Sequence, residues 1–374
     1  MDNIIPNILY LIIGAVLGVV FSVIFEDWLR RLKARIQRRW WWFRSLLGNG
    51  HNRISHELFQ VGRWRTNWIV LEGTASQPYQ KEHIICQLDS NPLELPEDLQ
   101  ELKKQIEDQQ AEVKASKGIP TYFNGPMVSF TDFTYSRTAS LEEPLLLLRF
   151  KPTDYYTFLA TSMSLDKYVI SATGTPVAVR DKYLRNTNYR RPIPEIATSF
   201  AVNLSVVTKD GYLLIAKRGQ RGIGGYPGSF TVPVNECVNP HVDRTEDGFV
   251  DIFRTACRGI QEELGISVTD DEIRFFSLGV DTIWYFYAIT GMITTSQFTL
   301  DDIRARRTVG IKDKWETIDL LHLDLDPKKA AYKLREMGGI SQWHPAGFVS
   351  VVQTFMHECG QRTVENAFKT MLPD

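Results

Sequence analysis

Apolar residues along this chain follow two spacings, one typical of strands and one typical of helices. Short β-prone runs predict strands, and they lie at residues 64–72, 82–88, 127–133, 145–150, 168–172, 177–179, 200–208, 212–217, 273–279 and 282–293. Recurrence at every third or fourth position predicts helices, and these lie at residues 96–115, 155–162, 249–264 and 346–357. Strands and helices are interspersed, so we predict an α/β (α+β) fold.

Local stop and start signals support several of these elements. Pro96 is followed by two acids and predicts a helix start, and Thr153 or Asp154 is placed to cap the helix at 155–162. His344-Pro345 predicts the start of the final helix, and the Lys-Asp-Gly triplet at 209–211 predicts a hairpin between two strands. The helix at 96–115 has few apolar anchors, which fits either a solvated insertion or an arm that faces a partner.

The first 25 residues differ from the rest of the chain. Residues 4–25 are uncharged and mostly apolar, and at the helical rise they would span roughly 33 Å, enough to cross a bilayer core. The start of the chain carries acid and amide side chains rather than the positive charge of a signal peptide, so we predict a transmembrane anchor over residues 1–26. A buried core helix is the alternative.

Residues 27–50 are rich in arginine and tryptophan and predict a basic amphipathic helix at the surface of the membrane. By the positive-inside rule, this charge predicts a single-pass inner-membrane protein with its N-terminus outside and its later domains in the cytoplasm. Gly14 and Gly18 form a Gly-xxx-Gly pair within the apolar span and predict a face for homo-oligomer formation.

Composition narrows the range of partners. The chain has 374 residues and a formal net charge of -1, so its length allows two or three domains and its charge predicts no duplex nucleic acid as a partner. Its 4 cysteines show no Cys-x-x-Cys spacing and fit reduced thiols better than disulfides or zinc ligands. We predict a β-rich region with an inserted helix at residues 51–191 and a separate domain at 192–374.

Two neighbouring carboxylates, Glu262 and Glu263, lie in the last turns of the helix that Gly265 ends. The helix dipole disfavours negative charge at a C-terminus, so we expect a cation to offset the pair. A divalent metal ion would do this. The alternative that spacing leaves open is a solvated Glu-Glu pair on a surface helix.

The segment 258–266 resembles the second half of the Nudix box, in which Arg-Glu is followed by an apolar residue, a Glu-Glu pair and a glycine. The matching residues are Arg258, Ile260, Glu262, Glu263, Gly265 and Ile266. Gly259 stands where the pattern has its glutamate after the arginine, and Val250 stands where it has an earlier glutamate. Residues 226–236 resemble the strand that carries a Pro-Gly-Gly turn in that family, and a polar insertion follows at 239–248.

This resemblance implies a Nudix-like α/β/α sandwich with a mixed sheet over residues 192–374. Nudix enzymes cleave nucleoside diphosphates joined to another group, with Mg²⁺ (or Mn²⁺) held by glutamates of the box. The resemblance therefore implies that Glu262 and Glu263 are metal ligands and that they act with Arg258 in catalysis. Other acids are candidates for further metal ligands, namely Asp243, Glu246, Asp247, Asp301, Asp302, Asp313 and Glu316.

The resemblance also implies where a substrate would bind. Family members often place an arginine at the end of the second strand of this domain, near the substrate, and Arg218 holds that position. Arg221 and Tyr226 follow in the glycine-rich segment 219–228 and are further candidates for substrate binding. A solvated basic loop is the alternative for the two arginines.

An anchor combined with an altered box resembles the membrane-tethered Nudix domains associated with CD-NTase-type (SMODS) nucleotidyltransferases in bacterial antiphage defence. That resemblance implies a protein that senses or processes a nucleotide messenger. Three functions follow as hypotheses: a nucleotide-binding sensor or effector, a Mg²⁺-dependent pyrophosphohydrolase or phosphodiesterase, and a tethered interaction module without a ligand.

Overall fold

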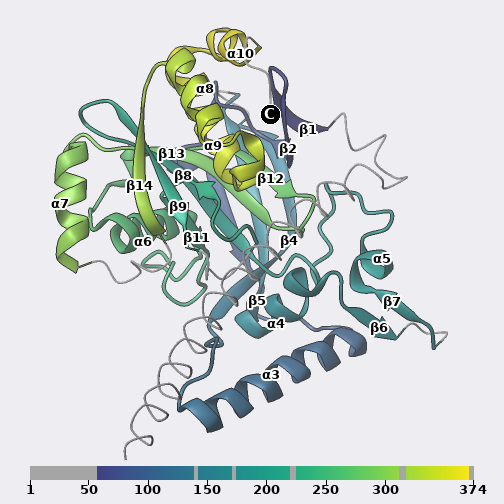
Figure 1. Cartoon of the computed structure of the whole chain (residues 1–374). Coiled ribbons are helices and arrows are strands. Elements are labelled where there is room, and N and C mark those ends of the chain that lie inside the picture. Colours follow the sequence, from purple (N-terminus) through teal and green to yellow (C-terminus); the bar gives the residue numbers. More distant parts are fainter. Residues whose placement is uncertain (1–56, 139–141, 171–173, 220–224, 311–316, 370–374) are drawn as a thin grey trace, which may run out of the picture. The chain divides into compact units, whose positions relative to one another are not determined.

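The chain folds as a mixed arrangement of helices and strands (Figure 1). The computed structural model describes residues 57–138, 142–170, 174–219, 225–310 and 317–369. All of these belong to one compact unit, which runs from Glu57 to the C-terminus.

A nine-stranded sheet is the centre of the part of the chain that the structure describes. Its strands run in the order β1-β2-β12-β13-β8-β9-β10, with β11 on β8 and β14 on β9. Strands β13 and β8 are parallel and the other pairs are antiparallel, so the sheet is mixed. The strands are β1 (Leu58–Val61), β2 (Trp64–Glu72), β8 (Phe200–Val207), β9 (Tyr212–Arg218), β10 (Phe230–Thr231), β11 (Val234–Cys237), β12 (Ile273–Asp281), β13 (Tyr287–Thr294) and β14 (Thr317–Asp324).

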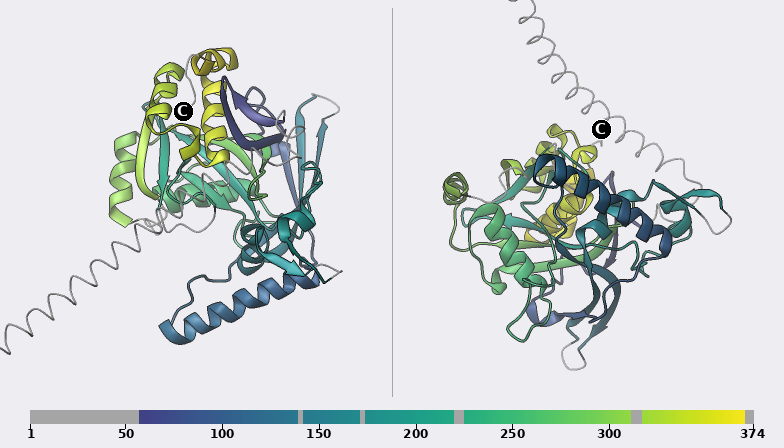
Figure 2. Two further views of the ribbon diagram at one scale, coloured as in Figure 1. Left: turned by 45° about the vertical axis from the view of Figure 1, so that its right-hand side comes forward. Right: turned by 90° about the horizontal axis from the view of Figure 1, so that it is seen from below.

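The middle of the chain forms a second, smaller layer. Strands β3 (Ile84–Leu88), β5 (Pro144–Asp154) and β4 (Pro126–Arg137) form a three-stranded sheet, and β6 (Tyr168–Ile170) pairs with β7 (Pro176–Ala178). The helices here are α3 (Glu97–Lys117), α4 (Tyr155–Ala160) and α5 (Val179–Tyr183) (Figure 2). The ring of Phe130 on β4 lies 5.0 Å from those of both Phe200 and Tyr287, which joins this layer to the main sheet.

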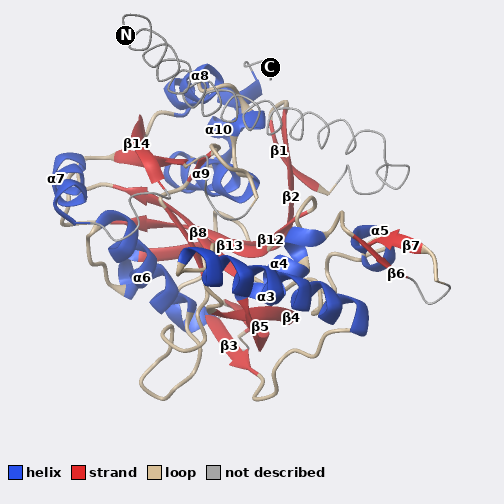
Figure 3. Ribbon diagram, turned by 60° about the horizontal axis from the view of Figure 1, so that its bottom comes forward, coloured by secondary structure: helices blue, strands red, loops and turns tan. Residues whose placement is uncertain are grey.

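Helices cover both sides of the main sheet. Figure 3 shows α9 (Pro345–Cys359) and α6 (Ile252–Leu264) on opposite sides of β8 and β13. The helix α10 (Gln361–Lys369) packs against both α9 and α8 (Pro327–Glu336), and α7 (Leu300–Gly310) packs beside α6. The main sheet therefore has helices against both of its faces.

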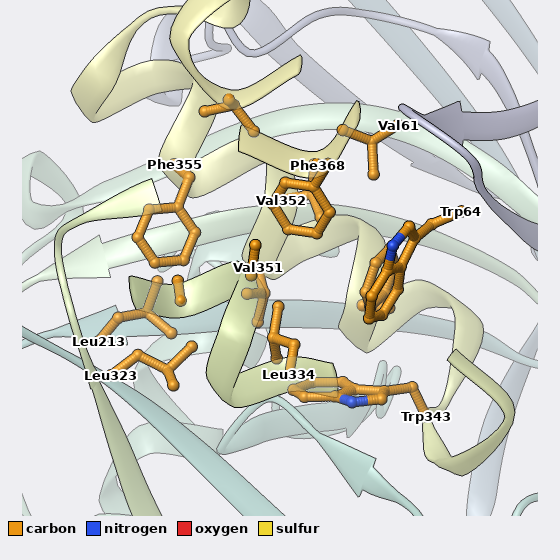
Figure 4. Packing of buried hydrophobic residues seen from close by; sticks show 14 of the residues in the cluster. Val61, Trp64, Leu213, Leu323, Leu334, Trp343, Val351, Val352, Phe355 and Phe368 are labelled. Carbon is orange, nitrogen blue, oxygen red and sulfur yellow. The ribbon is translucent and has the colours of Figure 1, made fainter. Parts of the chain in front are cut away.

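The apolar core beside α9 joins the beginning and the end of the described chain (Figure 4). The ring of Trp64 on β2 stacks on Phe348 of α9, with 5.8 Å between the ring centres, and meets Phe368 of α10 edge-on. Both Trp64 and Phe348 are fully buried. Residues from the predicted β-rich region therefore complete the core of the C-terminal half.

The predicted transmembrane helix and the single-pass inner-membrane placement must be corrected. No helix among the described residues is long and apolar enough to cross a membrane. The helix α3 has 21 residues, which is sufficient length, but acids and lysines recur along it and only one face is buried. The predicted span at 4–25, the basic helix at 27–50 and the Gly14/Gly18 face lie outside the described residues. We therefore describe the fold as mixed α/β and assign no transmembrane helix to it.

Most of the other predicted elements are present, with two differences. Strand β14 was not among the predicted strands, and it pairs with β9. Strands β1 and β2 join the main sheet through β12, so that sheet extends across the predicted boundary at residue 192. The boundary itself stays a prediction.

Candidate functional site

The helix α6 presents the residues that resemble the Nudix box. Asp251 caps its N-terminus by accepting a hydrogen bond from the amide of Phe253, and Gly265 ends it in the left-handed conformation at φ 69. Buried apolar side chains on the inner face pack the helix against β11 and β8. This packing leaves Arg258, Glu262 and Glu263 at the boundary between core and solvent, where each is half-buried.

Arg258 is the hub of a charged cluster between α6, β11 and the insertion at 239–248. Its Nε and Nη2 each lie 2.8 Å from an oxygen of Asp243, and Nη2 also donates to the carbonyl oxygen of Cys237 at 2.9 Å. Its Nη1 lies 2.8 Å from Glu236 Oε1 and 3.1 Å from Glu262 Oε2. A guanidinium has five N–H donors, so this geometry gives each of them an acceptor within the protein.

Burial and charge act in opposite directions on this cluster. Burial alone would lower the pKa of Arg258. The hydrogen bonds that Arg258 donates to Asp243 and the charge of Glu236 outweigh burial and raise that pKa, so the guanidinium stays protonated. The Asp243 side chain is only 1% exposed and also accepts from the amide of Asn239 and the hydroxyl of Thr255. Asp243 was a candidate metal ligand, and the structure places it as the buried partner of Arg258.

Glu263 faces a different arginine. Its charge acts to raise the pKa of Arg307 on α7, as does that of Asp319 on β14, although burial is the larger effect and leaves that pKa lowered. Asp319 lies opposite Lys217 in the ladder between β14 and β9. The two box carboxylates therefore have separate cationic neighbours, Arg258 for Glu262 and Arg307 for Glu263.

A close contact with β11 explains why residue 259 is a glycine, and the sequence did not reveal this contact. A Cβ added there would lie 2.9 Å from Val234 Cγ1 and 3.1 Å from Glu236 Cβ, closer than real contacts allow. The helix packs so closely on the side chains of β11 that a side chain at residue 259 would have to displace them. Glu236 instead supplies a carboxylate next to this position, from the neighbouring strand.

Glu236 is the residue that sequence reasoning missed. No spacing rule relates it to Arg258, which lies 22 residues later. The only indication in the sequence that Glu236 belongs to the site was its position on the strand before the insertion.

The described residues do not form a ready metal centre. They contain no group of three or more His, Cys, Asp or Glu side chains that could hold a metal ion. Glu262 is bonded to Arg258, and among the other candidate acids Asp302 instead accepts from the amide and hydroxyl of Thr299. Asp313 and Glu316 lie outside the described residues. Mg²⁺ or Mn²⁺ binding therefore stays a prediction.

Tyr226 belongs to a second polar cluster, near the start of α9. Its hydroxyl donates to Asp281 Oδ2 at 2.7 Å, and its ring meets the ring of His344 edge-on at 5.1 Å. Arg218 ends β9, and its charge reaches the same histidine. Arg218 and Tyr226 are therefore both near His344, whereas Arg221 lies outside the described residues.

Two buried groups in this cluster have displaced pKa values. Burial, with a smaller effect from the charge of Arg218, lowers the pKa of His344 to about 3, so the ring stays neutral and accepts a bond from the Gly347 amide. Burial raises the pKa of Asp281 to about 6, against the opposing hydrogen bonds from Tyr226 and the amides of Ile283 and Trp284. Tyr226 thus has a hydrogen-bonding partner within the protein, and its predicted contact with substrate stays a prediction.

Comparisons with known proteins point in one direction without establishing a family. No family model matches the chain, and no curated protein matches it. The similar solved structures include DR0079 from Deinococcus radiodurans, which is 11% identical with a TM-score of 0.27, and the alignment covers 50% of this chain and 96% of that one.

Two further similar structures carry family names. The MutT protein from Methanosarcina mazei Go1 is 17% identical with a TM-score of 0.27, over 44% of this chain and 93% of that one. A MutT/nudix family protein from Enterococcus faecalis is 12% identical with a TM-score of 0.26, over 51% and 90%. The similarity to these structures establishes no family for this chain.

Proposed function

We propose that this chain binds a nucleotide through a Nudix-like domain and acts by binding rather than by hydrolysis. The observation that carries the proposal is the saturation of Arg258, whose five donors hold Glu236, Asp243, Glu262 and the carbonyl of Cys237. A carboxylate bonded in this way shares its negative charge with the guanidinium, which weakens its attraction for a metal ion.

Gly259 supports the same conclusion. The box pattern has a glutamate at this position, and a side chain there would have to displace those of Val234 and Glu236 on β11. The helix therefore offers one fewer carboxylate than the pattern. Loss of a metal ligand or of a residue that orients one commonly lowers activity by orders of magnitude.

The proposed ligand is a phosphate-bearing nucleotide, and an oligonucleotide messenger made by a nucleotidyltransferase is the specific candidate. A sensor works only if its ligand binds one of two states more tightly than the other. The insertion at 239–248 is attached to α6 by the bonds of Asp243, so a ligand that contacts both could favour one arrangement of the insertion. Association with an unidentified protein partner, without any ligand, is the outcome that would remain if no nucleotide binds.

A second candidate function has one specific observation in its favour. Glu236 and Glu262 approach the same nitrogen of Arg258, at 2.8 and 3.1 Å, so a carboxylate from β11 lies beside a carboxylate from α6. Mg²⁺ commonly uses one or two carboxylates together with phosphate oxygens and water. This arrangement would favour a metal-dependent pyrophosphohydrolase if the arginine released one of the two.

The test is turnover and binding measured on the same full-length protein. Nucleoside diphosphate compounds and cyclic and linear oligonucleotides are incubated with Mg²⁺ or Mn²⁺ and analysed by mass spectrometry, while calorimetry measures their binding with a chelator present. The proposal predicts binding without turnover. Metal-dependent turnover that is lost in Glu262→Gln but kept in Glu101→Gln, an exposed acid of α3, would replace the sensor by the hydrolase.

A further inference from the structure

A cavity of about 350 Å³ lies along the outer face of α6. The helix contributes Arg254, Arg258 and Gln261, the insertion contributes Val242, and Ser267 follows the end of the helix. The volume is within the range typical of small-molecule sites, roughly 300–1,000 Å³. Glu263 does not line this cavity, because it faces α7 from another side of the helix.

The charges that line the cavity leave one cation available. Arg258 is fully occupied by its carboxylate and carbonyl partners, and Asp243 is its bidentate, buried partner. Arg254 lies one turn earlier and is exposed, and within the described chain no hydrogen bond or ion pair engages its guanidinium. A planar guanidinium with open donors is well suited to bind a phosphate through two parallel hydrogen bonds.

A second donor and apolar surface lie beside Arg254. The hydroxyl of Ser267 donates to Gln261 Oε1 at 2.8 Å, and this bond leaves the amide NH₂ of Gln261 as a donor. Val242 is 59% exposed at the rim and offers an apolar surface there. The cavity thus combines a cation, a neutral donor and an apolar wall.

We infer that this outer cavity binds the phosphate group of the ligand, with Arg254 and Gln261 as donors and Val242 against its less polar part. The inference rests on the proposed nucleotide binding, and it places the phosphate away from the Glu262–Glu263 pair. A ligand here touches both the insertion and α6, which gives binding a direct effect on the contact between them. Cys257 also lines the cavity, but burial raises the pKa of its thiol to about 11, so it remains an uncharged part of the wall.

The experiment uses the full-length protein with a metal chelator present, and inorganic pyrophosphate and ADP as probes in calorimetry. Arg254→Ala should weaken the binding of both about tenfold or more, since a charge-assisted hydrogen bond is lost. Arg254→Lys should recover part of the affinity because it keeps the charge but loses the paired geometry. The matched control Arg63→Ala removes an equal charge from an exposed turn and should leave affinity unchanged.

The outcomes separate this site from the proposed function. Nucleotide binding that is equal in wild type, Arg254→Ala and Arg63→Ala would overturn the outer site and leave the proposed function standing. Pyrophosphate binding that depends on Arg254, without binding of any nucleotide, would support an anion site and end the nucleotide proposal. Binding of neither probe by the wild type would overturn the site. Circular dichroism confirms that each variant is folded. As a second test, Val242→Trp fills the rim of the cavity without changing its charge and should block the binding of both probes.

Discussion

The helices α9 and α6 pack on opposite sides of one sheet, each through buried apolar side chains, and α6 also carries an ionic cluster. Side chains from Pro345 to Phe355 of α9 are buried, and its polar contacts are neutral, such as the hydroxyl of Ser350 on the Gly291 carbonyl at 2.7 Å. The outer half of α6 is held by Arg258 and three carboxylates. Apolar packing holds both helices on the sheet, and the ionic bonds of α6 form the candidate site.

The largest effect is expected from the core beside α9. Phe348→Ala removes a fully buried ring that contacts Trp64, Trp343 and Phe368, and should lower the free energy of unfolding by about 4 kcal/mol, as large core truncations do. Urea unfolding of the full chain measures it. Tyr332→Ala, at a side chain that is 59% exposed, is the control and should cost under about 0.5 kcal/mol. An equal loss of unfolding free energy in the two variants would show that the Phe348 ring does not stabilise this core.

The next largest loss of stability is expected from the ionic cluster around Arg258. Arg258→Met leaves Asp243 buried without its cation and should cost about 3 kcal/mol, because an unpaired buried charge is poorly tolerated. Adding Asp243→Asn should recover part of that loss. The control is Arg304→Met, since Arg304 and Asp301 form an exposed pair at 3.6 Å whose loss should cost under about 0.5 kcal/mol. A cost for Arg258→Met no larger than the control would mean that the cluster does not hold the helix.

The pH dependence of stability should contain two opposing contributions from the end of the sheet near α9. Asp281 has a folded pKa of about 6, above its ordinary value, so its contribution is fully present below about pH 4 and is lost as pH rises through 6. His344 has a folded pKa of about 3, below its ordinary value, so its contribution is present above about pH 6.5 and is lost as pH falls toward 3. Between pH 4 and 6 the two slopes oppose each other.

Variants should separate these slopes. In Asp281→Asn the free energy of unfolding should rise with pH between 4 and 6, and in His344→Asn, which keeps a capping side chain, it should fall. Each slope is at most about 1.4 kcal/mol per pH unit, the value for one proton. Urea titrations at several pH values measure it, and two variants that run parallel to the wild type would remove both assignments.

A smaller effect is expected where α6 approaches β11. Gly259→Ala places a methyl group within 2.9 Å of Val234 Cγ1, which costs stability, while alanine favours the helix over glycine. The net loss should be about 1 kcal/mol. Val234→Ala in the same chain relieves the contact, so the double variant should lose less than the sum of the two single changes. Strict additivity would show that this contact is not tight.

The sequence predicted what local patterns encode. The spacing of apolar residues and Gly265 located α6, a β-prone run located β2, and the Lys-Asp-Gly triplet at 209–211 located the β8–β9 hairpin. Each of these depends on neighbours in the chain, which is where propensity and capping act. Strand β14 was missed because it forms against β9, a partner far away in the sequence.

The candidate site was predicted only in part for a related reason. The expectation that a cation lies near Glu262 followed from the helix dipole, but its identity depends on contacts across 15 to 22 residues. The bond between Arg258 and Asp243 spans 15 residues and crosses an insertion, and nothing in the spacing distinguishes Asp243 from Glu246 or Asp247. The position of Glu236 in this cluster follows from the packing of β11 on Gly259, which the sequence did not predict.

The central claim is that arginine, not a divalent metal ion, is the cation beside the carboxylates of α6. The direct measurement is Mn²⁺ affinity of the full-length protein by calorimetry, with wild type and Glu262→Gln compared. The account predicts that no site tighter than about 1 mM, the weak end of specific binding, depends on Glu262. A micromolar Mn²⁺ site in the wild type that disappears in Glu262→Gln would contradict it.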